Sequence, residues 1–454
     1  MPDCLRYSLP SFLFLIAQII FPIRAVPELI TCDFCNAGYS RPAFMKTMTQ
    51  RKKKEAGKPG KKKSMVRTVV DKLHLWLGLA SGLIVLIISI TGCLFVFQRE
   101  INELVYHRQM HVVPQEQTLP LSVLRDHAQQ ALGADKPILS MTTWRLPDRA
   151  WEFMAYKAND TALTYFGVME YYESVLVNPY TGQVTGRIDY KYNFFSIVKY
   201  IHWSLLLNTK YGQPVVGWST VIFVVLLITG LIMWWPKRWT KATRDQSFKI
   251  KWKAGFKRIN YDLHNVLGFY SLLVALVIAL TGMVWAFKWF ETAVYVAASG
   301  TTTAPVSPVY TSIKTTAGAG NPPLDMAFDA AQPMLKNVDR VFVYPASYPE
   351  GVHTIGGYKG KDIYFGADEL KFDQYTGKLL GREEYRKKNS GEKLIAMNYD
   401  IHVGAIGGLP GKILAFIISF ICASLPVTGF YIWWGKQRKA RKKAAKPVAR
   451  LNTI

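Results

Sequence analysis

Four histidines lie at matching places in the two halves of this 454-residue chain, and they are the residues best suited to bind a cofactor. His74 and His264 each begin a long apolar segment, and His202 and His402 each precede another. A histidine beside lipid is costly unless it is paired or bound, because hydrocarbon offers its ring nitrogens no hydrogen-bond partner. Four histidines at repeated positions therefore indicate cofactor ligands rather than ordinary residues of the membrane interface.

The elements that must position these histidines are long enough to cross a membrane. Each segment contains no Lys, Arg, Asp or Glu and reaches the roughly 20 residues that one crossing needs. The segments are Leu73 to Phe97, Pro214 to Trp235, Leu263 to Phe287 and Ile413 to Trp434. Continuous apolar runs favour helices over the alternating strands of a barrel. We predict a mainly α-helical membrane protein with four transmembrane helices.

The net charge of +25 is concentrated beside these spans. Met45 to Arg67, Pro236 to Arg258 and Lys436 to Ile454 together hold 27 Lys and Arg against two acidic residues, which equals the whole net charge. With alternating helices all three basic patches fall on one side, as the positive-inside rule asks of cytoplasmic segments. We therefore expect a membrane protein with both termini inside and contacts to anionic lipid, and no nucleic-acid partner.

This topology divides the histidines into two pairs. His74 and His264 are expected near the cytoplasmic face, and His202 and His402 near the outer face. A haem iron takes two axial ligands on opposite sides of the ring, and neutral imidazole is a good ligand. When histidines fill both positions, no site remains for oxygen and the haem is suited to electron transfer. The pattern thus predicts two haem irons, one bound by each pair.

Other histidines compete for the outer positions. His107 and His111 are four residues apart just beyond the first span and share a helical face. They could replace His202 or His402 as ligands, bind a metal ion at the outer opening, or belong to a solvated stalk. His127 and His353 are expected at the surface of the outside segments.

The two halves share further landmarks at a nearly fixed offset, which indicates a duplication. Asp71 to Gly78 resembles Tyr261 to Gly268, and Asn178 to Gly186 resembles Asp373 to Gly381. Every span also contains a Thr-Gly step, for which close helix packing is the default explanation and a direct cofactor role the alternative. The steps are Thr91-Gly92, Thr229-Gly230, Thr281-Gly282 and Thr428-Gly429. Trp234-Trp235 and Trp433-Trp434 are expected to form an interfacial belt.

Each half is therefore expected to consist of a helix, an outside α+β domain and a helix. In the outside segments Leu121 to Leu132 and Leu324 to Leu335 have helical periodicity. Strand-like runs follow each helix, at Ala150 to Tyr156 and Tyr171 to Val177 in the first segment and at Arg340 to Tyr344 and Ile363 to Phe372 in the second. The expected divisions are an N-terminal extension 1–44, a basic cytoplasmic segment 45–72, TM1 73–97, outside domain 98–199, an interfacial segment with TM2 200–235, a basic loop 236–261, TM3 262–287, outside domain 288–398, an interfacial segment with TM4 399–434, and a basic tail 435–454.

The repeated motifs carry a family resemblance. From about Val66 to Lys439 the chain resembles the PepSY-associated transmembrane family, which includes iron-regulated inner-membrane proteins and haem-containing ferric-siderophore reductases. The resemblance rests on the His-x-x-Leu-Gly segments, the Tyr-Thr-Gly turns and the Thr-Gly steps before Trp-Trp, in the same order twice. It implies periplasmic PepSY-like domains, two haems b, and transfer of electrons from the cytoplasmic side to a ferric siderophore.

The electron donor is expected to be a separate cytoplasmic reductase or a membrane quinol. No Gly-rich dinucleotide fingerprint is present, and the cytoplasmic segments are too short for a flavin or NADPH domain. Aromatic residues of the outside domains are candidates for the acceptor surface, although most are expected to pack a small core and no substrate contact is assigned. They are Trp144, Trp151, Tyr165, Phe166, Tyr171, Tyr172, Tyr344, Tyr348, Tyr358 and Tyr364.

A second function of a different class stays open. In that interpretation the chain is a membrane-anchored binding or regulatory protein whose outside domains contact peptides or an uptake complex, and its histidines are structural. The extension 1–44 contains a short apolar stretch and a Cys32/Cys35 pair with redox or metal spacing, but Met45, Met48 and Met65 are alternative starts. The outside domains contain no cysteine, which excludes disulfides there.

Overall fold

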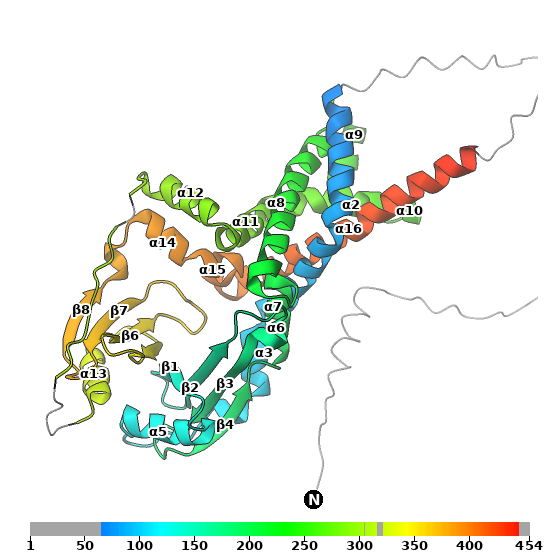
Figure 1. Cartoon of the computed structure of the whole chain (residues 1–454). Coiled ribbons are helices and arrows are strands. Elements are labelled where there is room, and N and C mark those ends of the chain that lie inside the picture. Colours follow the sequence, from blue (N-terminus) through cyan, green and yellow to red (C-terminus); the bar gives the residue numbers. More distant parts are fainter. Residues whose placement is uncertain (1–64, 304, 316–320, 445–454) are drawn as a thin grey trace, which may run out of the picture. The chain divides into compact units, whose positions relative to one another are not determined.

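Four long apolar helices form the membrane part of the computed structural model, which describes residues 65–303, 305–315 and 321–444. They are α2 (Met65–Val96), α8 (Thr209–Trp234), α11 (Gly268–Ala286) and α16 (Gly408–Ala444). Helix α2 packs against α8 and α16, and α11 packs against the same two helices (Figure 1). The four predicted transmembrane helices are confirmed. The extension 1–44, its Cys32/Cys35 pair and most of the basic segment 45–72 lie outside the described residues.

The third span begins before α11 and contains an irregular turn. Helix α10 (Phe256–Asp262) continues through a π-helical turn, η1 (Leu263–Leu267), into α11. A π turn inserts an extra residue into the helical repeat and often marks a functional position. Here it carries His264.

The outside segments build one eight-stranded antiparallel sheet with the strand order β4-β3-β2-β1-β5-β6-β7-β8. The first segment supplies β1 (Ile138–Trp144), β2 (Trp151–Ala158), β3 (Met169–Val177) and β4 (Val184–Asp189). The second supplies β5 (Arg340–Tyr344), β6 (Val352–Tyr358), β7 (Asp368–Asp373) and β8 (Leu379–Glu383). Strands β1 and β5 join the halves, with Met141 opposite Val343 and Trp144 opposite Arg340. The outside part is therefore α+β, as expected, although its strands form one shared sheet, and "mainly α" describes the membrane part.

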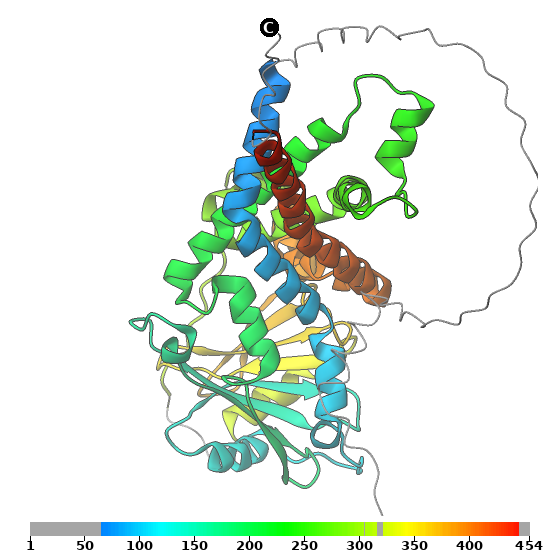
Figure 2. The same cartoon turned by 90° about the vertical axis from the view of Figure 1, so that its right-hand side faces the viewer.

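Side chains alternate between the two faces of this sheet, and the two faces differ in character. In β5, Val341 and Val343 lie in the hydrophobic core, whereas Arg340 and Phe342 line a cavity on the other face. Helices α5 (Leu121–Leu132) and α13 (Pro323–Ala331) cover the core face, on the side of the sheet away from the long helices (Figures 1 and 2).

The two halves share this core. Leu124, Phe153 and Val175 from the first half and Phe328 and Ile355 from the second belong to one buried cluster. Ser122 on α5 also donates hydrogen bonds to the Asp325 carboxylate on α13 through its backbone N–H (2.7 Å) and its hydroxyl (2.5 Å). The segments expected as two domains thus fold around a common core. The duplication itself stays a prediction, with which the mirrored strand order agrees.

Short helices connect the sheet to the spans: α3 (Gln98–Val105), α4 (His107–Met110), α7 (Phe194–Ser204), α12 (Lys288–Ser299), η2 (Tyr385–Lys387), α14 (Ser390–Ala396), α15 (Asn398–His402) and η3 (Ala405–Gly407). Of the other short helices, α6 (Tyr165–Val168) lies between β2 and β3, and α9 (Lys241–Phe248) lies in the basic loop between α8 and α10. At the start of α16 the buried Lys412 ammonium forms ion pairs with Glu100 on α3 (2.7 Å) and with Asp362 (2.8 Å). These contacts join the first half of the chain to the last helix.

One tryptophan pair differs from the expected interfacial belt. Trp234 is buried, stacks on Phe269 with ring centroids 3.7 Å apart, and donates its indole N–H to the Ser247 carbonyl. Its neighbour Trp235 is 58% exposed. Only Trp235 therefore fits the belt, and Trp234 is a packing residue.

Candidate functional site

The four histidines meet in two pairs. His202 on α7 and His402 on α15 have ring centroids 6.0 Å apart and form the sheet-side pair. His74 on α2 and His264 in η1 have ring centroids 6.4 Å apart and form the distal pair. Each pair contains one histidine from each half of the chain, as the topology argument predicted.

Every one of these rings is held by the threonine of a Thr-Gly step on a neighbouring helix. Nδ1 of His74 lies 2.9 Å from Thr229 Oγ1, and Nδ1 of His264 lies 2.9 Å from Thr428 Oγ1. The sheet-side pair repeats the contact, with His202 Nδ1 3.2 Å from Thr91 Oγ1 and His402 Nδ1 2.9 Å from Thr281 Oγ1. The repeated Thr-Gly steps and the repeated histidines are thus parts of the same constellation.

The threonine contacts determine which ring nitrogen carries the proton. Each of these threonine hydroxyls lies in range to donate to the carbonyl of the residue four positions earlier in its own helix, at 2.8 to 2.9 Å. The same oxygen must then accept from the histidine, so Nδ1 carries the hydrogen. At the sheet side, the carbonyls of Ile88 (2.8 Å) and Ile278 (3.1 Å) also accept from Nδ1. In a neutral imidazole this leaves the Nε2 lone pair free to bind a metal ion.

The glycine of each step leaves room for the ring. A Cβ atom on Gly230 would lie 3.4 Å from His74 Cε1, and one on Gly429 would lie 3.2 Å from His264 Cε1. At the sheet side the corresponding distances are 3.4 Å from Gly92 to His202 and 3.5 Å from Gly282 to His402. Helix packing, the default explanation of the Thr-Gly steps, is therefore incomplete, because each step seats a histidine.

The spacing and protonation of the pairs fit a cofactor iron bound between two histidines. Two imidazoles that bind one metal ion from opposite sides have ring centres about 6 Å apart, because each metal–nitrogen bond is about 2 Å long. The observed separations are 6.0 and 6.4 Å. Burial lowers the pKa of His202 and lowers that of His402 to about 3, so both rings are neutral, as a metal ligand must be.

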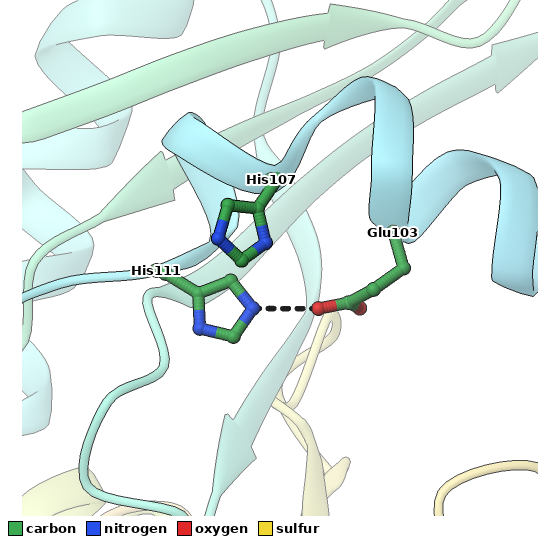
Figure 3. A group of neighbouring side chains, drawn as sticks. All are labelled: Glu103, His107 and His111. Atoms are coloured by element: carbon green, nitrogen blue, oxygen red, sulfur yellow. Dashed lines mark hydrogen bonds and ion pairs between the residues drawn. The ribbon is translucent and has the colours of Figure 1, made fainter.

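His107 and His111 belong to a different cluster (Figure 3). His111 Nε2 lies 2.6 Å from Glu103 Oε1 and His111 Nδ1 lies 3.1 Å from Asp148, while the His107 ring centroid is 4.3 Å from that of His111. Partial burial opposes ionisation of Glu103, but hydrogen bonds from Arg149 and His111 lower its pKa to about 2.

Glu103, His107 and His111 have the residue types of a metal site, with their ligand atoms within 4.8 Å of one another. The Arg149 guanidinium, however, pairs with Glu103 and lies 3.0 Å from His111 Nε2, so a cation already occupies this position. His111 is only partly exposed and is bonded on both nitrogens, which differs from a solvated stalk.

The two remaining histidines have structural roles. His127 Nδ1 bonds the Gly182 carbonyl at 2.9 Å and closes the turn after β3. His353 was expected at the surface, but it is buried and accepts a hydrogen bond from the Ala346 N–H at 3.0 Å. Burial lowers its pKa to about 4. The expectation for His353 is wrong because alternation in β6 places its side chain inside.

A cavity of about 1100 Å³ extends from the sheet-side pair to the sheet. His202, His402 and Gly92 line it at the membrane helices, and Trp144 and Arg340 line it at the sheet. Of the ten aromatic candidates, five line this cavity: Trp144, Tyr172, Tyr344, Tyr358 and Tyr364. Trp151 and Tyr165 are instead buried away from it.

Several residues of the cavity wall were not identified from the sequence. Arg340, Arg149 and Lys199 lie far apart in the chain, and no local pattern separates them from other basic residues. The four threonines of the Thr-Gly steps lie outside the cavity wall, and the sequence left packing as the default explanation for them and a direct cofactor role as the alternative. Two features of the sequence link these threonines to the histidines. There are four of each, and a 17-residue interval separates both His74 from Thr91 and His264 from Thr281.

Comparison with known proteins agrees with the repeated motifs. The family model described as PepSY-associated TM region matches residues 72–436, a range that includes all four spans, both histidine pairs and the sheet. None of the curated proteins compared with the chain matches it. Because the matched region covers most of the chain, this protein is a multi-pass membrane protein that belongs to the PepSY-associated transmembrane family.

Proposed function

We propose that this protein binds two haems b, one at each histidine pair, and transfers electrons across the membrane to a ferric siderophore. The observation that carries the proposal is the fourfold repetition of one arrangement: a histidine with Nδ1 held by a threonine, Nε2 free, and a second histidine about 6 Å away. A structural histidine has no need to leave one nitrogen free in a membrane, where an unpaired polar atom is costly.

The protein supplies position and protonation, and the cofactor supplies redox chemistry. A haem held by two histidines exchanges electrons without binding oxygen. Thr91, Thr229, Thr281 and Thr428 orient the ligands and hold their protons on Nδ1, which makes Nε2 a better donor to iron.

The direction of transfer follows from the charge distribution. The basic segments lie beside the ends of the spans that are near the distal pair, and the positive-inside rule assigns such segments to the cytoplasm. Electrons then enter at the distal pair from a separate reductase or a membrane quinol. They leave at the sheet-side pair, on the periplasmic side of a bacterial inner membrane.

The cavity beside the sheet-side pair is where the acceptor would bind. Its volume of about 1100 Å³ suits a molecule of the size of an iron chelate, since pockets for drug-sized ligands measure about 300–1,000 Å³. One-electron reduction of Fe(III) to Fe(II) weakens the hold of an oxygen-rich chelator, which releases the iron for uptake.

Absorption spectra of the detergent-purified protein from cells supplied with haem test the proposal. We expect a Soret band, paired visible bands on dithionite reduction, and two haems per chain. His74→Ala or His264→Ala should remove the distal haem alone, and His202→Ala or His402→Ala the sheet-side haem alone. His107→Ala is the matched control and should keep both.

A protein without any haem bands would leave the binding or regulatory function as the better interpretation. If a variant that lacks one of these four histidines kept both haems, the assignment of that histidine pair as haem ligands would be refuted. Rapid reoxidation of the reduced protein by other acceptors but by none of a panel of ferric siderophores would refute the iron role alone.

A further inference from the structure

Arg340 is a buried cation without an acidic partner. It is 8% exposed, lies on β5 at the seam of the two halves, and lines the cavity. Its Nη2 donates to the Ile363 carbonyl at 2.7 Å, but its buried Nε has no partner. Among the described residues no carboxylate forms an ion pair with it. A buried charge without a counter-charge is strongly unfavourable.

Aromatic rings surround this guanidinium. Its Cζ atom lies 4.1 Å from the ring centroid of Tyr364 and 4.6 Å from that of Tyr358, and Trp144 lies opposite Arg340 in the sheet. Cation–π contacts compensate only part of the lost hydration of the charge. The buried Asp400 carboxylate accepts from the Tyr364 N–H at 3.1 and 3.3 Å. Burial raises the pKa of Asp400 to about 6, and the nearby Arg340 charge opposes this rise without forming an ion pair.

Lys199 is a second, partly buried cation of the cavity wall. It lies on α7, three residues before His202, with its ammonium 5.0 Å from the ring centroid of Tyr200 and 6.0 Å from that of Tyr172. It too lines the cavity and has no carboxylate partner among the described residues. Two cations from different halves of the chain therefore face one space, and neither forms an ion pair among the described residues.

Other cations near the cavity do have acidic partners, which distinguishes them from Arg340 and Lys199. Arg99 pairs with Asp362, and Arg149 pairs with Glu103. The remaining acid of the cavity wall, Glu152, accepts a hydrogen bond from the Tyr190 hydroxyl and pairs with no cation in the described part of the chain. Its single charge does not balance Arg340 and Lys199, so the wall keeps a positive excess.

We propose that the sheet end of the cavity is an oxyanion site for negatively charged aromatic iron chelates, such as tris-catecholates, with Arg340 and Lys199 as their counter-charges. Tyr358 and Tyr364, which line the cavity beside Arg340, provide aromatic surfaces for the chelate rings. Neutral or cationic hydroxamate chelates leave both charges unpaired and bind weakly. The inference that the ligand carries iron rests on the proposed function, whereas the inference that the site binds an anion does not.

Binding of redox-inert gallium(III) chelates to the full-length protein in detergent tests this inference. Isothermal titration calorimetry compares a gallium tris-catecholate with a gallium hydroxamate of neutral or positive charge. We expect the anionic chelate to bind at least about tenfold more tightly. Arg340→Gln and Lys199→Gln should each weaken its binding about 10- to 100-fold, because each removes one charge-assisted hydrogen bond. Binding of the hydroxamate should stay unchanged.

Arg382→Gln is the matched control, because Arg382 lies on the same sheet but pairs with Asp368 at 2.6 Å. It should bind the anionic chelate as the unaltered protein does. A second measurement does not depend on the chelate: without ligand, Arg340→Met should raise the Tm, because it removes an unpaired buried charge.

Equal affinities for the two gallium chelates in the unaltered protein would overturn the inference. So would unchanged catecholate binding in both Arg340→Gln and Lys199→Gln.

The carboxylates of a bound haem offer the same chemistry as an external oxyanion. If Arg340→Gln lost haem or shifted its bands while binding the catecholate normally, Arg340 would serve the haem and the inference would be wrong. If the unaltered protein contained no haem but still bound the catecholate more tightly than the hydroxamate, the anion site would stand and the electron-transfer proposal would fail.

Discussion

Replacing Gly429 by alanine places one methyl group against the ring of His264. The added Cβ would lie 3.2 Å from Cε1 and 3.7 Å from Nδ1 of that ring. Gly282 is the equivalent position at the sheet-side pair, and its Cβ would lie 3.5 Å from His402 Cε1. The two variants make the same chemical change at matched sites and differ only in the space available.

The difference in space decides the expected effect. Carbon atoms attract one another best at about 3.5–4.0 Å, so the contact at Gly282 is ordinary and that at Gly429 is too close. The His264 ring can move little, because Nδ1 bonds Thr428 Oγ1 at 2.9 Å on the same helix as Gly429. Overpacking costs about 1–3 kcal/mol. Alanine returns about 1 kcal/mol through its higher helix propensity.

The net loss of folding stability at Gly429 is therefore about 1 kcal/mol. Helix propensity acts equally with and without haem, so the overpacking of about 1 kcal/mol or more against the ligand ring corresponds to at least roughly fivefold weaker retention of the distal haem. At Gly282 only the propensity gain remains. We expect Gly282→Ala to keep two haems and to unfold at a higher temperature. Haem content per chain, measured as the pyridine haemochrome during a wash with a haem-binding competitor, compares the two proteins, and thermal unfolding gives the stability.

Preferential loss of haem from Gly282→Ala, or equal retention in both variants and the unaltered protein, would refute the reasoning. The first result would mean that the sheet-side ring is the more tightly enclosed. The second would mean that the glycines do not form part of the ligand seat.

Further predictions concern a threonine and a buried lysine. Thr428→Val keeps the shape of the side chain but removes the acceptor of His264 Nδ1–H, so we expect about 10- to 100-fold weaker binding of the distal haem. Thr220→Val is its control, since the Thr220 hydroxyl bonds only its own helix at Val216, and normal haem retention in Thr428→Val would contradict the assigned tautomer. Lys412→Met should lower the free energy of unfolding by about 2 kcal/mol, because Glu100 and Asp362 lose their shared counter-charge but keep contact with water. Thermal unfolding should show no change for Lys157→Met, whose ion pair with Glu170 is exposed, and an equal effect of both variants would refute a bridging role of Lys412.

The membrane part of this fold could be predicted from the distribution of apolar residues along the chain, although not from the overall composition. Each span is a long run without charge, and nothing but a helix satisfies such a backbone in hydrocarbon. Leu121 to Leu132 and Arg340 to Tyr344 were likewise predicted with the bounds that α5 and β5 have. Strands β1, β4, β6 and β8 were not predicted, because short strands acquire their partners only through pairing.

Arg340 illustrates why the acceptor site could not be predicted. In the sequence it is one of 56 Lys and Arg residues, 27 of which lie in the three basic segments beside the membrane spans. It becomes unusual only because strand pairing places Trp144 and Tyr358 beside it and burial removes water. The same holds for His353, whose burial depends on the face of β6 that meets α13.

The sequence by itself determined that four spans exist, that four histidines stand at their ends, and that topology divides these histidines into two pairs. Hydrophobic length and repeated spacing are local properties, so they are visible before folding. Tertiary structure decided what holds each ring, because the threonine that bonds a histidine lies 111 to 164 residues away and meets it only when the helices pack. Tertiary structure also decided that His107 and His111 lie beside Glu103 and Arg149. It decided, too, that the outside segments share one sheet, which faces the sheet-side pair across the cavity.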